Sequence, residues 1–119
     1  MYTNIVLSGG ALKGTSFIGC LKYMEEQDCV KDFKNVLGSS SGSIMALFLV
    51  LGYTSCEIEI FLKKELSNLF DIKISNMLRF FKQYGLDDGT NIETFLEKIL
   101  EYKNISKNVT FMDLSKKNW

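Results

Sequence analysis

The sequence has 119 residues, of which 46% are hydrophobic and 13% aromatic, so it can form one packed domain or a piece of one. Its 14 basic and 14 acidic residues leave no net charge, which argues against recruitment by nucleic acid or by anionic lipid. The absence of histidine excludes a Ser-His-Asp triad built from this chain and removes the commonest metal ligand. We therefore expect neither a metal site nor a cofactor.

The three cysteines, Cys20, Cys29 and Cys56, form no C-x-x-C pair, which disfavours a zinc site or a disulfide framework. We expect reduced thiols, two of them buried as small apolar side chains. The N-terminus lacks the basic region of a signal peptide, and the apolar run 44–51 is too short to span a bilayer. We expect a cytoplasmic protein whose contact with membranes, where it occurs, is peripheral.

The first part of the chain alternates between short apolar runs, glycine-rich turns and helical patterns. Residues 4–8 and 33–37 indicate two short strands, and residues 15–26 and 43–51 have the spacing and length of helices. A glycine-rich turn joins each strand to the helix that follows. This alternation favours parallel strands joined by a right-handed crossover, with both turns at the carboxyl ends of adjacent strands. We expect an α/β fold with a parallel sheet core and flanking helices.

The rest of the chain is helical and less regular in pattern. Thr54 and Glu57 have the spacing of a capping box and predict the start of a helix. The apolar stretch 69–85 predicts a helix and a loop packed on the core, and the alternative is a flap that touches lipid. A turn then precedes an amphipathic helix that begins near Asn91, and the tail 108–119 is mostly polar.

Residues 38–42 spell Gly-Ser-Ser-Ser-Gly, a G-x-S-x-G pattern between a predicted strand and a predicted helix. In that context the pattern is typical of a nucleophile elbow, which presents the hydroxyl of Ser40 at the end of a sheet. Gly38 and Gly42 allow the backbone to approach closely and to adopt angles that a Cβ forbids. The alternative is a flexible turn without chemistry, because G-x-S-x-G alone is a weak signal.

The earlier turn, residues 8–14, can supply what an attacking serine needs. Attack on an ester builds negative charge on the carbonyl oxygen, and each donor already in place for that charge contributes about 3 kcal/mol. Backbone amides at Gly9, Gly10 and Ala11 can form such an oxyanion hole, while Lys13 holds the turn in shape or adds positive charge. A nucleotide-binding module stays open as an alternative, although neither G-x-x-x-x-G-K-S/T nor G-x-G-x-x-G fits.

Together the two turns resemble those of the patatin-like phospholipases, a family with Asp/Ser-Gly-Gly-Gly-x-Arg/Lys-Gly after its first strand and G-x-S-x-G after a later one. Residues 8–14 match the first pattern, except that Ala11 replaces its third glycine, and residues 38–43 match the second. Weaker similarities to the family, which extend the resemblance over nearly the whole chain, lie at residues 17–21, 85–89 and 110–114.

The resemblance implies a three-layer α/β/α domain that hydrolyses acyl esters of phospholipids or neutral lipids through an acyl-serine intermediate. It implies that Ser40 is the nucleophile and that the backbone at Gly9, Gly10 and Ala11 is the oxyanion hole. The residues implied to shape the two turns are Lys13, Gly14, Gly38 and Gly42.

The family pairs its serine with an aspartate and uses no histidine, which suits this chain. That aspartate lies far downstream in a D-G-G/A motif, which Asp88 and its neighbours resemble only superficially. We therefore expect residues 1–119 to be a single N-terminal portion of a patatin-like domain, with the aspartate beyond its end and negligible hydrolysis by this chain alone. The alternative is a catalytically inactive lipid-binding or interaction module of the same fold.

Overall fold

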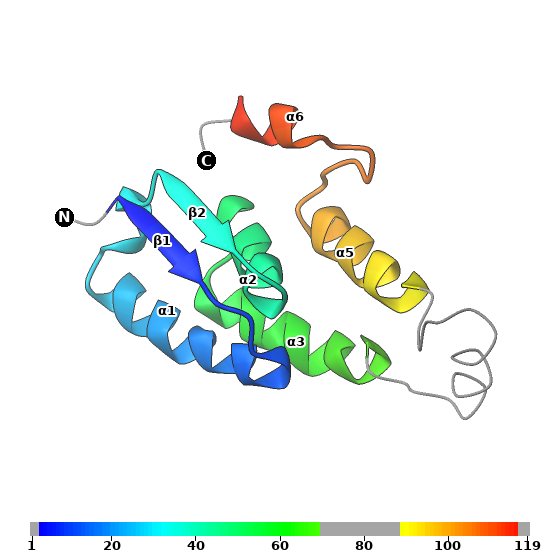
Figure 1. Ribbon diagram of the computed structural model, residues 1–119, viewed down its shortest axis with the longest axis horizontal. Coiled ribbons are helices and arrows are strands. Elements are labelled where there is room, and N and C mark those ends of the chain that lie inside the picture. The colour runs from blue at the N-terminus through cyan, green and yellow to red at the C-terminus, as the bar shows by residue number, and fades with distance from the viewer. Residues whose placement is uncertain (1–2, 70–88, 117–119) are drawn as a thin grey trace. The chain divides into compact units, whose positions relative to one another are not determined.

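The computed structural model of the protein describes residues 3–69 and 89–116. The chain divides into two compact units, Met1–Ile60 with Asn108–Trp119, and Phe61–Lys107. In chain order the elements are β1 (Asn4–Leu7), η1 (Ala11–Ser16), α1 (Phe17–Glu26), η2 (Val30–Asp32), β2 (Asn35–Gly38), α2 (Ser41–Val50), α3 (Ser55–Leu69), α5 (Thr90–Tyr102) and α6 (Phe111–Ser115) (Figure 1).

The sheet of the first unit is two-stranded and parallel. Asn4 pairs with Asn35 and Leu7 pairs with Gly38, so the carboxyl ends of β1 and β2 lie side by side. The second strand begins at Asn35, later than the predicted start at Phe33, and follows the short 3-10 helix η2 at Val30–Asp32. The predicted α/β class, with a parallel sheet and flanking helices, is confirmed.

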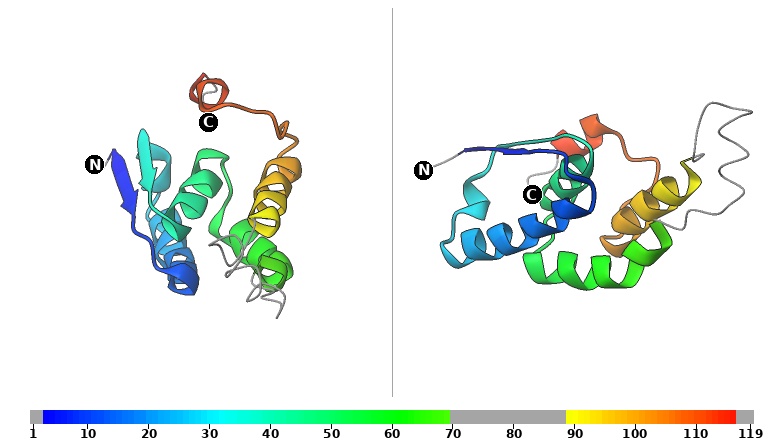
Figure 2. Two further views of the ribbon diagram at one scale, coloured as in Figure 1. Left: turned by 45° about the vertical axis from the view of Figure 1, so that its right-hand side comes forward. Right: turned by 60° about the horizontal axis from the view of Figure 1, so that its bottom comes forward.

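The two faces of this sheet differ in what covers them. Helix α2 packs against both strands, and α1 lies on the same side of the sheet as α2 (Figure 2). Leu7 faces these helices and is 5% exposed. Val6 and Leu37 pair across the strands, point to the opposite face, and are 74% and 54% exposed. The part of the chain that the structure describes therefore leaves an apolar sheet face in solvent.

The helix predicted after the first glycine-rich turn starts early, as the 3-10 helix η1 that passes into α1. The Thr15 hydroxyl donates to the Leu12 carbonyl at 2.8 Å, and the Ser16 hydroxyl donates to the Lys13 carbonyl at 2.7 Å. These bonds occupy carbonyls three residues back and support the tighter turn. Helix α1 then buries Leu21, which is 1% exposed.

The expectation that two cysteines are buried is wrong. Cys20 and Cys56 are exposed, Cys29 is half-buried, and all three are free thiols. Neighbouring residues on a helix are rotated by about 100° around its axis. Because Leu21 of α1 and Ser55 of α3 point inward, the residues next to them, Cys20 and Cys56, point outward.

The N-terminus of α3 is held by two carboxylates. The predicted capping box is present, because the Thr54 amide donates to Glu57 Oε2 at 2.7 Å and the Glu57 amide donates to Thr54 Oγ1 at 3.2 Å. From α1, Glu25 accepts the Ser55 amide at 2.7 Å and also accepts the Ser55 hydroxyl. Both carboxylates lie at the positive end of the helix dipole, which favours negative charge.

We expect Glu25→Ala to lower the free energy of unfolding by about 1–3 kcal/mol, because it leaves the Ser55 hydroxyl without its acceptor. Ser55 is only 4% exposed, so water replaces the lost partner poorly. Urea unfolding followed by circular dichroism measures the change. Glu26→Ala, at the exposed neighbouring position, is the matched control; equal effects of the two substitutions would contradict the capping role of Glu25.

The second unit contains the end of α3 and the predicted amphipathic helix, α5. The Phe61 ring packs edge-to-face against Phe95 and against Tyr102, with centroids 5.3 Å apart in both pairs. Glu65 is 5% exposed and forms an ion pair with Lys98, which compensates the cost of burying its charge. These contacts join α3 to α5 within the unit.

The predicted polar tail contains a short helix, α6, that starts with a capping box: Thr110 Oγ1 accepts the Asp113 amide at 3.2 Å and the Thr110 amide donates to Asp113 Oδ2 at 3.0 Å. Within the described ranges, no helix combines the length and apolar character that crossing a membrane requires. The stretch predicted as a packed helix and loop or as a lipid-touching flap lies almost entirely outside the described residues, as does Asp88.

Candidate active site

Ser40 lies in a sharp turn between β2 and α2. The strand ends at Gly38, the helix begins at Ser41, and Ser40 has φ 52° and ψ −126°. A positive φ is costly for a residue with a side chain, by about 1–3 kcal/mol, and such strain is concentrated at functional sites. The Ser40 carbonyl accepts the amide of Ser43 at 2.9 Å and also the Ser43 hydroxyl. The exposed Ser40 side chain is thus carried on a turn with a tightly held backbone.

The two glycines that flank this turn are required by close backbone contacts. A Cβ added at Gly42 would lie 2.2 Å from the Leu7 carbonyl oxygen and 2.6 Å from that of Ser8. A Cβ added at Gly38 would lie 2.3 Å from the Gly42 carbonyl oxygen. Neither glycine has a positive φ, so close approach alone explains them and the special backbone angles foreseen from the sequence do not occur. The first turn of α2 thereby sits directly on β1.

The first glycine-rich turn touches Ser40. A Cβ added at Gly9 would lie 3.0 Å from Ser40 Cβ and 3.7 Å from Ser40 Oγ. This contact follows from the parallel pairing, which ends β1 and β2 at the same edge of the sheet. Ala11 has φ 47°, in the left-handed region that favours glycine. Ala11 stands at the third glycine of the Gly-Gly-Gly pattern in the first turn. The positive φ explains why glycine is favoured at this position.

Ser41 joins the two turns, although the sequence analysis assigned it no role. Its Oγ accepts the Gly10 amide at 3.1 Å. A Cβ added at Gly14 would lie 2.8 Å from the same Oγ, so Gly14 leaves the space that the hydroxyl occupies. Ser41 could have been singled out from the sequence because it directly follows the elbow serine. In hydrolases with this turn, the backbone N–H of that residue faces the developing oxyanion.

Lys13 shapes the first turn through its backbone. Its amide donates to the Gly10 carbonyl at 2.9 Å, and its carbonyl accepts the Ser16 hydroxyl. Its side chain is exposed, and within residues 3–69 and 89–116 its ammonium group forms no ion pair. The contacts of Lys13 in the described residues are therefore backbone contacts within the first turn, and its role stays a prediction.

No carboxylate in the described part of the chain hydrogen-bonds to the Ser40 hydroxyl. Asp28 instead pairs with Lys31, and this hydrogen bond raises the pKa of Lys31. Asp113 caps α6. The acidic residues in segment 70–88 lie outside the described residues.

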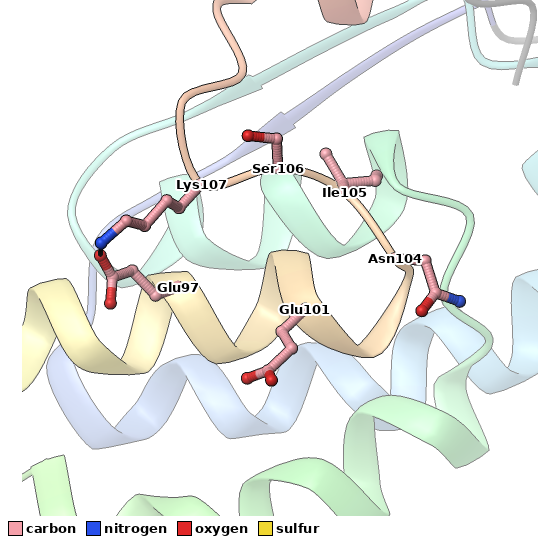
Figure 3. Close-up of a pocket in the computed structure, with 6 residues that line it drawn as sticks. All are labelled: Glu97, Glu101, Asn104, Ile105, Ser106 and Lys107. Atoms are coloured by element: carbon pink, nitrogen blue, oxygen red, sulfur yellow. Dashed lines mark ion pairs between the residues drawn. The ribbon is translucent and has the colours of Figure 1, made fainter.

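A surface hollow of about 550 Å³ lies in the second unit and contains none of the site residues predicted from the sequence. It is open and is formed by the end of α5 and the loop that follows, with Lys107 3.3 Å from Glu97 across it (Figure 3). The lining residues are Glu97, Glu101, Asn104, Ile105, Ser106 and Lys107. Its lining comes from one helix and the loop after it, so it lacks the strand-turn-helix arrangement that surrounds Ser40.

The family model of patatin-like phospholipases matches residues 5–118. The chain is 34% identical over 114 residues to probable lipid hydrolase 463L of Invertebrate iridescent virus 6, covering 94% of this chain and 38% of that protein. It is 32% identical over 124 residues to the protein YqhO of Bacillus subtilis (strain 168), covering 98% of this chain and 41% of that protein. It spans about two fifths of the length of these curated relatives. No solved structure matches the chain.

Proposed function

The chain belongs to the patatin-like phospholipase family, and on that premise we propose that it carries the nucleophile, Ser40, of a lipid acyl hydrolase. The observation that carries the proposal is the turn itself. An exposed serine with φ 52° stands at the N-terminus of α2 and in contact with the glycine-rich turn after β1. This is the strand-turn-helix context in which G-x-S-x-G presents a nucleophile.

In the proposed reaction, Ser40 Oγ attacks the carbonyl carbon of a lipid acyl ester, and its proton passes to an aspartate. The alcohol portion of the lipid leaves with a proton, and the acyl group stays on Ser40 as an ester. Water then hydrolyses this ester, releasing the fatty acid and restoring the serine. Because the chain spans about two fifths of its relatives, we place the aspartate in sequence beyond residue 119 of a longer protein.

The oxyanion of the intermediate needs donors that are already oriented. The first amides of a helix have no acceptor within that helix, and the helix dipole makes this end positive. Ala11 begins η1 and Ser41 begins α2, so their amides are the donors that the geometry favours. Gly9, predicted as part of the same hole, lies against Ser40 and lets the turn approach it without obstruction.

The proposed substrates are phospholipid or neutral lipid esters, reached by a cytoplasmic protein through peripheral contact with a membrane. Leu12 follows Ala11 in the first turn and is 54% exposed. An exposed leucine on the turn whose Gly9 contacts Ser40 can touch an acyl chain or the surface of a bilayer, which fits this substrate class.

The test uses the full-length protein that contains this chain. We expect Ser40→Ala to abolish labelling by a fluorophosphonate probe and to lower the rate of phospholipid vesicle hydrolysis by at least about 10³-fold. Ser39→Ala removes the neighbouring hydroxyl and is the matched control, because the structural bonds of Ser39 are made by its backbone: its amide donates to the Leu7 carbonyl at 3.0 Å and its carbonyl accepts the Gly42 amide at 2.9 Å. Hydrolysis that persists in Ser40→Ala would refute the assignment.

A second function, lipid binding without catalysis, is favoured by one observation: no described carboxylate reaches Ser40. Under this alternative the full-length protein binds lipid vesicles in a flotation assay, and the probe fails to label it. Labelling at Ser40 together with vesicle hydrolysis excludes the alternative.

A further inference from the structure

We infer that Ser41 is a positioning residue, whose hydroxyl ties the glycine-rich turn to the turn that carries Ser40. This inference rests on the proposed function, because it concerns how the oxyanion donors of that reaction are held. It assigns the Gly10 amide to the structure of the site and leaves the Ala11 and Ser41 amides to the substrate.

A hydrogen bond and a close approach place the Ser41 hydroxyl between the turns. It accepts the Gly10 amide at 3.1 Å. It fills the space above Gly14, where an added Cβ would lie 2.8 Å from Oγ and 3.0 Å from Ser41 Cβ. Gly14 is buried and Ser41 is half-buried, so the hydroxyl packs against the turn. Since Ser41 is the first residue of α2, the tie joins the Gly-rich turn to the helix that begins right after Ser40.

This tie holds a backbone that would otherwise relax. Ala11, directly after Gly10, has φ 47°, which an alanine adopts only at a cost. A hydrogen bond at the Gly10 amide fixes the Gly9–Gly10 peptide on one side of Gly10. On its other side the Gly10 carbonyl, which shares its peptide with the Ala11 amide, accepts the Lys13 amide at 2.9 Å. The direction of the Ala11 amide, and hence its use as an oxyanion donor, depends on both peptides of Gly10 being held.

The two possible roles of the Gly10 amide predict different changes in the rate of hydrolysis when the Ser41 hydroxyl is removed. If the Gly10 amide were an oxyanion donor, removal of the Ser41 hydroxyl would free it, and hydrolysis would be unchanged or faster. If the hydroxyl positions the turn, its removal loosens the donors and slows the chemical step. Because Ser41 Oγ is engaged by the Gly10 amide and packs against Gly14, it is not assigned to the substrate, and substrate affinity is expected to change little.

The kinetic test uses the full-length protein and vesicles of phosphatidylcholine. We expect Ser41→Ala to lower kcat roughly five- to tenfold and to leave KM unchanged. This factor corresponds to the loss of one hydrogen bond that positions the oxyanion donors. Ser41→Thr keeps the acceptor oxygen and is expected to retain most of kcat. Gly14→Ala leaves Ser41 in place but displaces its hydroxyl, and is expected to lower kcat as Ser41→Ala does. Ser115→Ala removes a hydroxyl that bonds only to the Met112 carbonyl and is the control.

Amide hydrogen exchange, measured by NMR in the same proteins, detects the hydrogen bond between the Gly10 amide and Ser41 Oγ independently of enzymatic activity. The Gly10 amide is expected to exchange faster in Ser41→Ala than in the wild type, while Ser41→Thr restores its protection. Unchanged exchange, or a Ser41→Ala variant whose kcat equals or exceeds that of the wild type, would overturn this inference alone. A wild-type protein without Ser40-dependent hydrolysis would overturn the proposed function and this inference together.

Discussion

Replacing Gly42 with alanine is expected to lower the free energy of unfolding of the first unit by more than about 3 kcal/mol, because overlap with backbone atoms costs more than ordinary overpacking of side chains. The new Cβ would lie 2.2 Å from the Leu7 carbonyl oxygen and 2.6 Å from the Ser8 carbonyl oxygen. Both atoms belong to the backbone, so no side-chain rotation can relieve the overlap. The N-terminus of α2 must move away from β1, and Ser40, directly before this helix, must move with it.

Urea unfolding followed by circular dichroism measures this effect, and fluorophosphonate labelling of the full-length protein reports on Ser40. Gly19→Ala is the matched control, because nothing lies within 4 Å of a Cβ added at Gly19 in the first turn of α1. That substitution is expected to stabilise the helix by roughly 0.5–1 kcal/mol. If Gly42→Ala unfolds at the same urea concentration as the wild type, the close contact between α2 and β1 is absent.

Replacing Phe48 with alanine is expected to lower the free energy of unfolding by about 3–5 kcal/mol, the usual cost of deleting a buried aromatic ring. Phe48 is fully buried at 0% exposure, and its ring packs edge-to-face on Tyr53 with centroids 5.0 Å apart. The substitution leaves a cavity under α2, the helix that covers the sheet and starts at the candidate active site. Since α2 also positions the turns, probe labelling of Ser40 should weaken near the unfolding transition.

Phe111→Ala is the control for this prediction, because it deletes the same ring from a position that is 90% exposed. Its effect on the free energy of unfolding is expected to stay within about 0.5 kcal/mol. Thermal and urea unfolding of both variants provide the comparison. Similar losses for the two phenylalanines would show that burial of the ring under α2 does not hold the unit together.

The local elements were predictable because each depends on residues close together in the chain. Alternating apolar runs and glycine-rich turns predicted the parallel pair of strands and the helices that follow them, and the structure confirms this arrangement. The capping box at Thr54 and Glu57 was predictable for the same reason, since its two hydrogen bonds span only three residues. The resemblance of the two turns to the patatin-like family is likewise supported by the family match over residues 5–118.

Features that depend on the rotation of a helix or on contacts between distant segments were not predictable. Composition suggested buried cysteines, yet Cys20 and Cys56 are exposed because their neighbours Leu21 and Ser55 take the inward positions. Gly38 and Gly42 were expected to allow both a close backbone approach and unusual backbone angles, and the structure shows the close approach without the angles.

The sequence by itself determined the order of the elements, the two glycine-rich turns and the position of Ser40 in the second turn, because turn chemistry and apolar periodicity are local. Only the tertiary structure decided that Gly9 lies against Ser40 and that the Ser41 hydroxyl, 31 positions along the chain from Gly10, accepts its amide. Such contacts arise where parallel strands end at one edge of a sheet, and they bring together atoms whose separation along the chain carries no local signal.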